Sequence, residues 1–152
     1  MITILLVDDN GPVRKSLRSL LETSDDMQIV ATATNGMDAV EKARSYRPDI
    51  AIMDISMPLM DGIEATDHIR ECCGLTEVII LSTFDDSEYV RRALEVGAKG
   101  YVLKDTAGED LLDAIHAIEL GIHYFSKKIA EIAVEFLAHK GNAKPKKPTV
   151  NL

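Results

Sequence analysis

Five short apolar segments, each followed by an amphipathic segment, set the strongest constraint on how this chain folds. The apolar segments are Ile2–Val7, Gln28–Thr34, Asp49–Met53, Glu77–Leu81 and Gly100–Leu103. All five are typical of strands, and the Ile, Val and Leu content of Ile2–Val7 and Asp49–Met53 indicates strands that are buried. Five alternations of strand and helix predict an α/β fold, a doubly wound five-stranded parallel sheet with helices on both sides.

The expected helices are marked by residues that favour helix starts and ends. Asn10 precedes the first helix, which has Pro12 in its first turn, and Pro48 follows the end of the second. The fourth helix is expected over Asp86–Val96 and the fifth over Glu109–Leu120. A last amphipathic segment predicts an additional C-terminal helix; its apolar residues are Ile129, Ile132, Ala133, Phe136 and Leu137.

Charge is distributed unevenly along the 152 residues. Residues 1–137 contain 13 basic and 25 acidic residues, a net charge of −12, whereas residues 138–152 carry +4. Such an acidic body is a poor surface for nucleic acid, because phosphate binding relies on Lys and Arg. No apolar run approaches the roughly 18 residues that a membrane helix needs, and no signal peptide precedes the first strand. A cytoplasmic protein is expected.

Two adjacent cysteines, Cys72 and Cys73, are the whole cysteine content. Neighbouring cysteines close only a strained ring, and no spacing typical of a zinc site is present. We expect two reduced thiols.

Polar side chains follow four of the predicted strands. Asp8 and Asp9 follow the first strand, Asp54 the third, Ser82 the fourth and Lys104 the fifth. In open α/β sheets, ligands bind at the carboxyl ends of the strands, so these side chains are expected to meet. Clustered carboxylates repel one another unless a cation intervenes, and Mg²⁺ is the natural one. A carboxylate can itself accept a phosphoryl group, whose oxygens a lysine and a hydroxyl can bind.

These positions lie in four longer motifs. They are Leu6-Val-Asp-Asp-Asn10, Met53-Asp-Ile-Ser-Met-Pro-Leu-Met-Asp-Gly62, Ile80-Leu-Ser-Thr83 and Gly100-Tyr-Val-Leu-Lys-Asp105. Over about residues 1–121 the chain closely resembles the receiver domain of two-component response regulators. The Lys104-Asp105 pair, with Phe84-Asp-Asp86 and Tyr89, is similar to the NarL/FixJ subfamily, whose output is a LuxR-type helix-turn-helix domain.

The resemblance implies a flavodoxin-like sheet with strand order 2-1-3-4-5 and a role for each matching residue. Asp54 is implied as the phosphoacceptor that becomes 4-aspartylphosphate. Asp8 and Asp9, with Asp54 and the backbone carbonyl of Ser56, are implied as Mg²⁺ ligands. Lys104 is implied to contact the phosphoryl group. Ser82 and Tyr101 are implied as the hydroxyl and the aromatic side chain of the switch.

The resemblance also implies partners and a domain plan. A sensor histidine kinase would supply the phosphoryl group. Phosphorylation would promote a homodimer through the face of the fourth helix, fifth strand and fifth helix. We expect a receiver domain over residues 1–121, an additional helix over 122–139 and a basic linker over 140–152. DNA binding would belong to a C-terminal domain absent from this chain, and no membrane partner is expected.

Other classes of protein fit the sequence less well. A haloacid-dehalogenase-like phosphatase also forms an aspartyl-phosphate, but it needs an Asp-x-Asp run after the first strand, where this chain has Asp8-Asp-Asn-Gly-Pro12. A nucleotide or flavin binder lacks support because no glycine-rich phosphate loop follows that strand. A stand-alone receiver that acts in phosphotransfer or protein interaction stays open as an alternative. We therefore expect a signalling module and not an enzyme.

Overall fold

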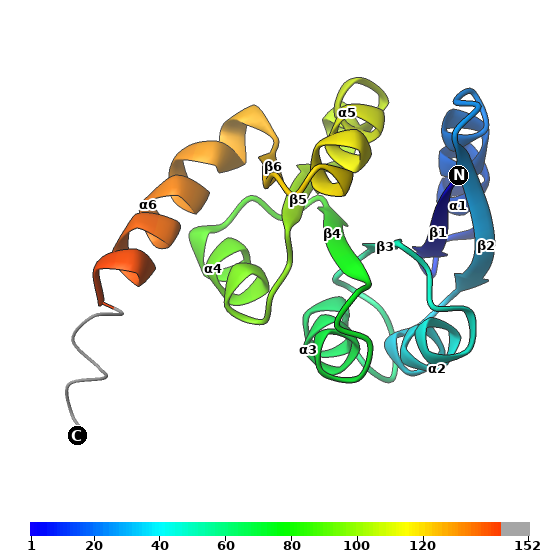
Figure 1. Ribbon diagram of the computed structural model, residues 1–152, viewed down its shortest axis with the longest axis horizontal. Coiled ribbons are helices and arrows are strands. Elements are labelled where there is room, and N and C mark those ends of the chain that lie inside the picture. The colour runs from blue at the N-terminus through cyan, green and yellow to red at the C-terminus, as the bar shows by residue number, and fades with distance from the viewer. Residues whose placement is uncertain (144–152) are drawn as a thin grey trace.

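Six parallel strands form one sheet in the computed structural model, which describes residues 1–143 (Figure 1). The strands are β1 (Ile2–Val7), β2 (Met27–Ala33), β3 (Ile50–Met53), β4 (Glu77–Ser82), β5 (Gly100–Leu103) and β6 (Tyr124–Phe125). Their order in space is β2-β1-β3-β4-β5-β6. The doubly wound fold and the order 2-1-3-4-5 are thereby confirmed, and a sixth strand is added at the β5 edge.

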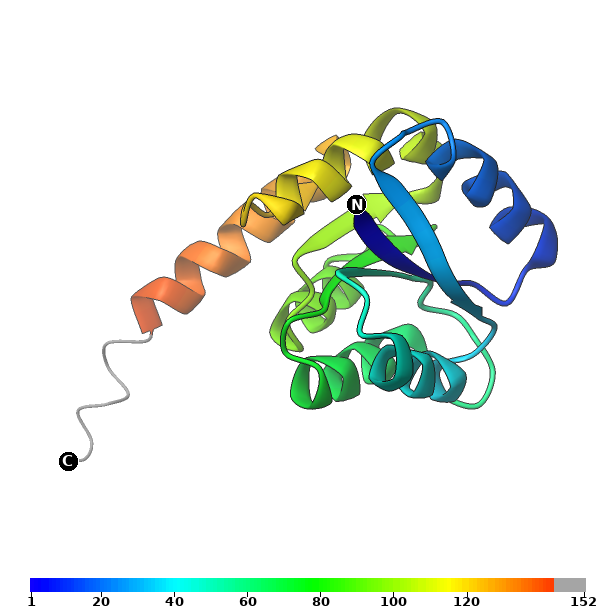
Figure 2. The ribbon, with the colours of Figure 1, turned by 45° about the vertical axis from the view of Figure 1, so that its right-hand side comes forward.

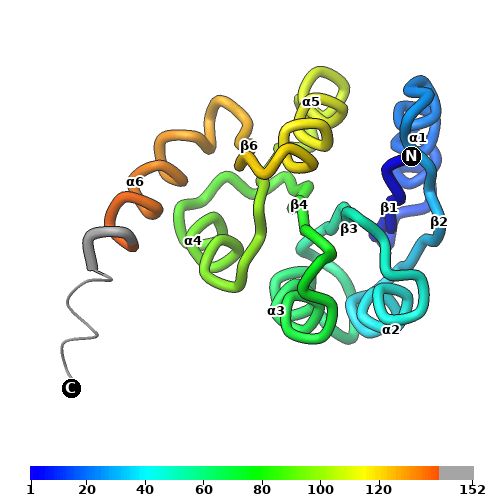
Figure 3. The backbone as a smooth tube through the Cα atoms, viewed as in Figure 1, coloured from blue at the N-terminus to red at the C-terminus, as the bar shows by residue number. Residues whose placement is uncertain are grey.

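Helices cover both faces of the sheet, as the backbone trace shows (Figure 3). Helices α1 (Gly11–Leu21) and α5 (Ala107–Glu119) lie on one face; α2 (Gly36–Tyr46), α3 (Gly62–Cys72) and α4 (Ser87–Glu95) lie on the other. The side chains of β1 alternate between two hydrophobic cores. Ile4 and Leu6 pack with α1 and α5, whereas Leu5 and Val7 pack with α2, α3 and α4. A strand buried on both faces explains why the apolar runs are unbroken.

Three helices on this scaffold begin with a side-chain cap. Asn10, Asn35 and Asp61 each accept a hydrogen bond from the backbone N–H three residues later, at 2.8–3.0 Å. Such a cap satisfies one of the amide groups that the first helical turn leaves free. The starts of these three helices are therefore stabilised by contacts between residues that are close in the sequence.

The sixth strand was not expected from the sequence. Its two residues pair in parallel with Gly100 and Tyr101 of β5. Gly100 permits the close approach, because a Cβ at this position would lie 3.0 Å from the Tyr124 carbonyl oxygen and 2.9 Å from Cδ1 of Ile118. The prediction of five strands was one short, because a two-residue strand has no periodicity to detect.

The additional C-terminal helix, α6 (Lys127–Ala143), lies beside α4 (Figure 1) and extends away from the sheet (Figure 2). Its Ile129 and Ala133 are buried in the core that also contains Val90 of α4. The helix continues beyond residue 139 into the range that we expected to be linker; residues 144–152 of that range lie outside the described part. Strand β6 and helix α6 cover part of the face expected to form a homodimer. Within residues 1–143, no helix is both long enough and apolar enough to cross a membrane.

Candidate functional site

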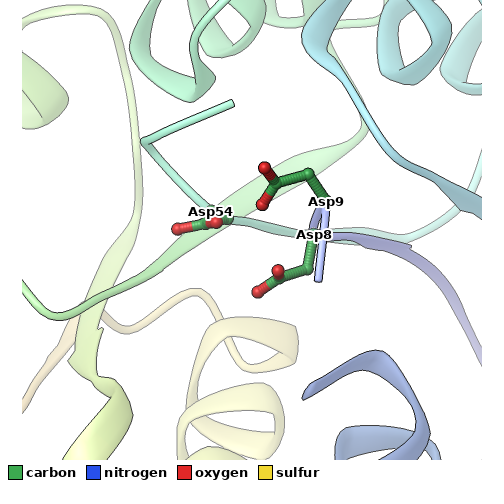
Figure 4. Close-up of side chains that lie close together, drawn as sticks. All are labelled: Asp8, Asp9 and Asp54. Atoms are coloured by element: carbon green, nitrogen blue, oxygen red, sulfur yellow. The ribbon is translucent and has the colours of Figure 1, made fainter. Parts of the chain in front are cut away.

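Three carboxylates meet at the carboxyl ends of two neighbouring strands. Asp8 and Asp9 directly follow β1, and Asp54 directly follows β3, with which β1 pairs in parallel. Each side chain offers an oxygen that lies within 4.8 Å of the oxygens of the other two (Figure 4). Asp8 and Asp54 are buried, with 1% and 6% of their surface exposed, whereas Asp9 is exposed. The sequence prediction that these acids meet is supported by this geometry.

Lys104 brings a positive charge to the same place. It follows β5 directly and begins a short 3₁₀ turn, η1 (Lys104–Thr106). Its Nζ lies 3.1 Å from Oδ2 of Asp8 and 3.3 Å from Oδ1 of Asp54. Burial disfavours the charged ammonium, but its ion pairs with Asp8 and Asp54 outweigh this effect and raise the pKa of Lys104. The lysine therefore remains a cation in the site.

Asp54 is a weaker acid than an ordinary aspartate. Burial raises its pKa from 3.8 to about 6, and the neighbouring charge of Asp8 adds to the effect, although Lys104 opposes it. A carboxylate with a raised pKa is a stronger base than an ordinary aspartate. A further cation that enters the site would favour the charged form of this carboxylate and lower its pKa.

The donor set fits a hard divalent cation. Oδ1 of Asp8 accepts a hydrogen bond from the Asn10 amide at 2.9 Å. Its Oδ2 is buried and has no hydrogen-bond partner among residues 1–143; its contact with Lys104 is an ion pair. Three carboxylates against one ammonium leave an excess of negative charge, and carboxylate oxygens are the ligands that Mg²⁺ takes.

The two residues expected to form the switch, Ser82 and Tyr101, are joined through Phe84, which the sequence indicated only as part of a subfamily motif and not as a site residue. The Ser82 Oγ accepts a hydrogen bond from the Phe84 amide at 3.0 Å, and the Tyr101 hydroxyl donates to the Phe84 carbonyl at 2.7 Å. Ser82 and Tyr101 are fully buried. Tyr101 thus already points inward in this structure. The Phe84 ring stacks on Tyr89 of α4, with 4.6 Å between ring centroids, so this residue connects the site to α4.

The loop between β3 and α3 depends on two glycines that sequence reasoning left out of the site. The Gly62 amide donates to the Ile55 carbonyl at 2.9 Å, and a Cβ on Gly62 would lie 1.9 Å from the Asp54 carbonyl oxygen. Gly36 likewise lies against Met60, where a Cβ would be 2.4 Å from the carbonyl oxygen. Both close approaches involve backbone atoms, which cannot move aside cheaply, so the loop that carries Asp54 requires glycine here.

Ser56 is exposed in that loop, and no hydrogen bond within residues 1–143 joins it to the acids. The role of its carbonyl as a metal ligand stays a prediction. The structure thus brings together Asp8, Asp9, Asp54 and Lys104, and it links Ser82 to Tyr101 through the Phe84 backbone.

Comparison with known proteins decides the family. The family model described as "Response regulator receiver domain" matches residues 4–116, which is most of the chain. The chain belongs to the response regulator receiver family. This receiver domain is 41% identical over 121 residues to "Transcriptional regulatory protein LnrK" of Bacillus subtilis (strain 168), covering 80% of this chain and 55% of that protein.

Two further relatives place the receiver domain in the LuxR/NarL type of response regulator. It is 40% identical over 139 residues to "Oxygen regulatory protein NreC" of Staphylococcus haemolyticus (strain JCSC1435), covering 90% of this chain and 64% of that protein. The crystal structure of a LuxR-family two-component response regulator from Aurantimonas sp. SI85-9A1 is 38% identical, with a TM-score of 0.83, and the match covers 88% of this chain and 95% of that one. The receiver domain thus spans 55–64% of the length of these two curated relatives.

Proposed function

We propose that this receiver domain is a phosphorylation-activated switch in which Asp54 accepts a phosphoryl group from a sensor histidine kinase in the cytoplasm. The observation that carries the proposal is the buried Asp54 carboxylate, held between the ammonium of Lys104 and two further acids at the carboxyl edge of the sheet. The ammonium of Lys104, and acids that can hold a divalent cation, supply the positive charge that transfer of an anionic phosphoryl group to a carboxylate requires.

In the proposed step, a carboxylate oxygen of Asp54 attacks the phosphorus of a phosphohistidine. A bond forms between that oxygen and phosphorus, the phosphorus–nitrogen bond breaks, and the imidazole retains the electron pair and is protonated by solvent. Lys104 neutralises charge on the transferred phosphoryl oxygens. Asp8, Asp9 and Asp54, with the Ser56 carbonyl, would hold Mg²⁺, which supplies charge neutralisation at the phosphoryl group. The Ser82 hydroxyl would then bind a phosphoryl oxygen.

Labelling with a small acyl phosphate tests the proposal without a kinase. The receiver domain is incubated with acetyl phosphate, with Mg²⁺ or with EDTA, and its intact mass is measured. We expect one phosphoryl group on the wild type in Mg²⁺ and essentially none in EDTA. Asp54→Asn should take up none under either condition.

Asp67→Asn is the matched control, because Asp67 is an exposed carboxylate on α3 without a hydrogen bond or ion pair to residues 1–143. It should be labelled like the wild type. Unchanged labelling of Asp54→Asn, or full labelling in EDTA, would overturn the assignment of Asp54 and of Mg²⁺ respectively.

We further propose that this chain is the receiver part of a longer transcription regulator, with phosphorylation promoting a homodimer and a separate C-terminal domain binding DNA. Support comes from the LuxR-family relative and from the curated relatives, which are longer than the match. The acidic charge of residues 1–137 argues against DNA binding by this part. Mobility-shift assays should show no specific DNA binding by these 152 residues; specific binding would contradict the proposal.

A further inference from the structure

A cluster of four hydrogen-bonding side chains lies next to the site and has no part in the proposed chemistry. Asp110, in the first turn of α5, accepts hydrogen bonds from the hydroxyl groups of Thr106 at 2.7 Å, Tyr124 at 2.8 Å and Ser126 at 3.1 Å. Burial disfavours the Asp110 carboxylate, but these three donors outweigh it and lower its pKa. We call these four residues the Asp110 cluster.

Within the cluster, Ser126 is bonded to β5 on both sides of Val102. Its amide donates to the Tyr101 carbonyl at 3.0 Å, and its Oγ accepts from the Leu103 amide at 2.9 Å. Lys104 is the next residue along the chain. The backbone that presents the site lysine is therefore held directly by Ser126, which is itself 98% buried.

Ser126 also directly precedes α6 (Lys127–Ala143). Its carbonyl accepts the amide of Ile129 at 2.8 Å, in the first turn of that helix. Ile129 and Ala133 lie in the same hydrophobic core as Tyr101 and Leu103. The contact of α6 with α4 is incomplete, because a groove of about 700 Å³ lies between them, lined by residues such as Arg92, Glu135 and Phe136. Helix α6 is thus hydrogen-bonded to β5 through Ser126 at its start and packed into the core through Ile129 and Ala133, with an open groove beside Phe136 further along.

We propose that Asp110 and Ser126 are positioning residues that couple the Lys104 end of β5 to α6, so that phosphorylation at Asp54 changes how α6 packs on α4. When Lys104 engages a phosphoryl group, the end of β5 moves with it. The bonds of Ser126 pass that movement to the start of α6, and Asp110 keeps the Ser126 hydroxyl oriented. This inference rests on the proposed function of Asp54.

Hydrogen-exchange mass spectrometry of the full 152-residue chain tests the coupling. Exchange in peptides from α6 is compared with and without acetyl phosphate and Mg²⁺, and the intact mass reports labelling of each sample. In the wild type we expect exchange of the α6 amides to change on phosphorylation. In Ser126→Ala and Asp110→Asn, we expect normal labelling, but that change reduced by about fivefold or more.

Three further variants separate coupling from loss of structure. Asp113→Asn removes an exposed carboxylate from the same helix, one without a hydrogen bond to residues 1–143, and should behave as the wild type. Ser126→Thr keeps the hydroxyl and should restore the response. Tyr124→Phe removes only one donor to Asp110 and should give an intermediate response even if Asp110→Asn fails to fold.

The outcomes are distinguishable. A merely structural role would alter α6 exchange equally in both states and leave their difference unchanged, which would overturn the coupling. A labelled wild type whose α6 does not respond would overturn it too. Failure to label the wild type would instead overturn the proposed function of Asp54, on which the coupling depends.

Discussion

At the scale of single residues, the raised pKa of Asp54 makes stability depend on pH. The folded chain holds a proton on this carboxyl up to about pH 6, whereas the unfolded chain releases it near 3.8. Because the folded state binds this proton more tightly, the contribution of Asp54 to stability is most favourable below pH 3.8. It is lost as the pH rises to about 6.

Asp54→Asn should therefore be more stable than the wild type at neutral pH in the absence of divalent metal. We expect the free energy of unfolding to rise by on the order of 1–2 kcal/mol at pH 7, allowing for solvent screening, and to change little at pH 4. Urea unfolding at both pH values in EDTA measures the difference. A variant that is less stable than the wild type at pH 7 would contradict the pKa assignment.

The Ser82 hydroxyl gives a second prediction at this scale. In the structure its Oγ accepts a hydrogen bond from the Phe84 amide, so removal leaves this part-buried amide without its partner. Ser82→Ala should still be labelled at Asp54, but phosphorylation should change the tyrosine fluorescence less than it does in the wild type. Thr83→Ala, at the exposed neighbouring position, is the control. Identical fluorescence responses in Ser82→Ala and the wild type would refute a switching role.

At the scale of elements, Gly62 fits α3 against the end of β3. Gly62→Ala would place a Cβ 1.9 Å from the Asp54 carbonyl oxygen, so the loop must shift. We expect a loss of about 1–3 kcal/mol in the free energy of unfolding, together with slower labelling of Asp54. Chemical unfolding and acetyl phosphate labelling measure the two effects.

Gly108 supplies the matched control for this substitution. It lies in the first turn of α5, where a Cβ would meet nothing within 4 Å. Gly108→Ala should leave labelling unchanged and raise the free energy of unfolding by about 0.5–1 kcal/mol, since alanine favours helix and restricts the unfolded chain. If Gly62→Ala and Gly108→Ala change the free energy of unfolding equally, the close approach of Gly62 to the Asp54 carbonyl oxygen has no effect on stability.

The elements that the sequence predicted correctly are those marked by residues that are neighbours in the sequence. Unbroken apolar runs marked the first five strands, and residues such as Asn10 marked helix starts. Site residues at strand ends were also predictable, because parallel strands bring their carboxyl ends to one edge. Strand β6 was missed, since two residues acquire strand geometry only by pairing with β5, whose Gly100 has no distinctive pattern in sequence.

The missed site residues act mainly through backbone groups or close approach. Phe84 joins Ser82 to Tyr101 by its amide and carbonyl, and every residue type except proline offers both. Gly62 is required because of the Asp54 carbonyl oxygen, which only the folded loop brings near. Neither relation is encoded in side-chain chemistry or spacing, so a single sequence does not reveal it.

At the scale of the whole molecule, the chain folds one of its own helices over the face that we expected to form a homodimer. Helix α6 lies along α4, and β6 pairs with β5. A second copy that used this face would first have to displace α6. Phosphorylation of Asp54 and dimerisation are therefore expected to be linked through the position of α6, which is the element that continues toward the C-terminus (Figure 2).

Strand β6 has a further consequence, for solubility. Without it, the backbone N–H and C=O groups along the outer side of β5, whose four residues are all buried, would be open to pairing with strands of other molecules. A chain ending at residue 121 should therefore aggregate in a concentration-dependent manner more readily than one ending at residue 126, which keeps β6 and, like the shorter chain, lacks α6. Light scattering of the two truncated chains over a range of concentrations measures this; equal dispersion of both would show that the uncovered edge of β5 does not cause self-association.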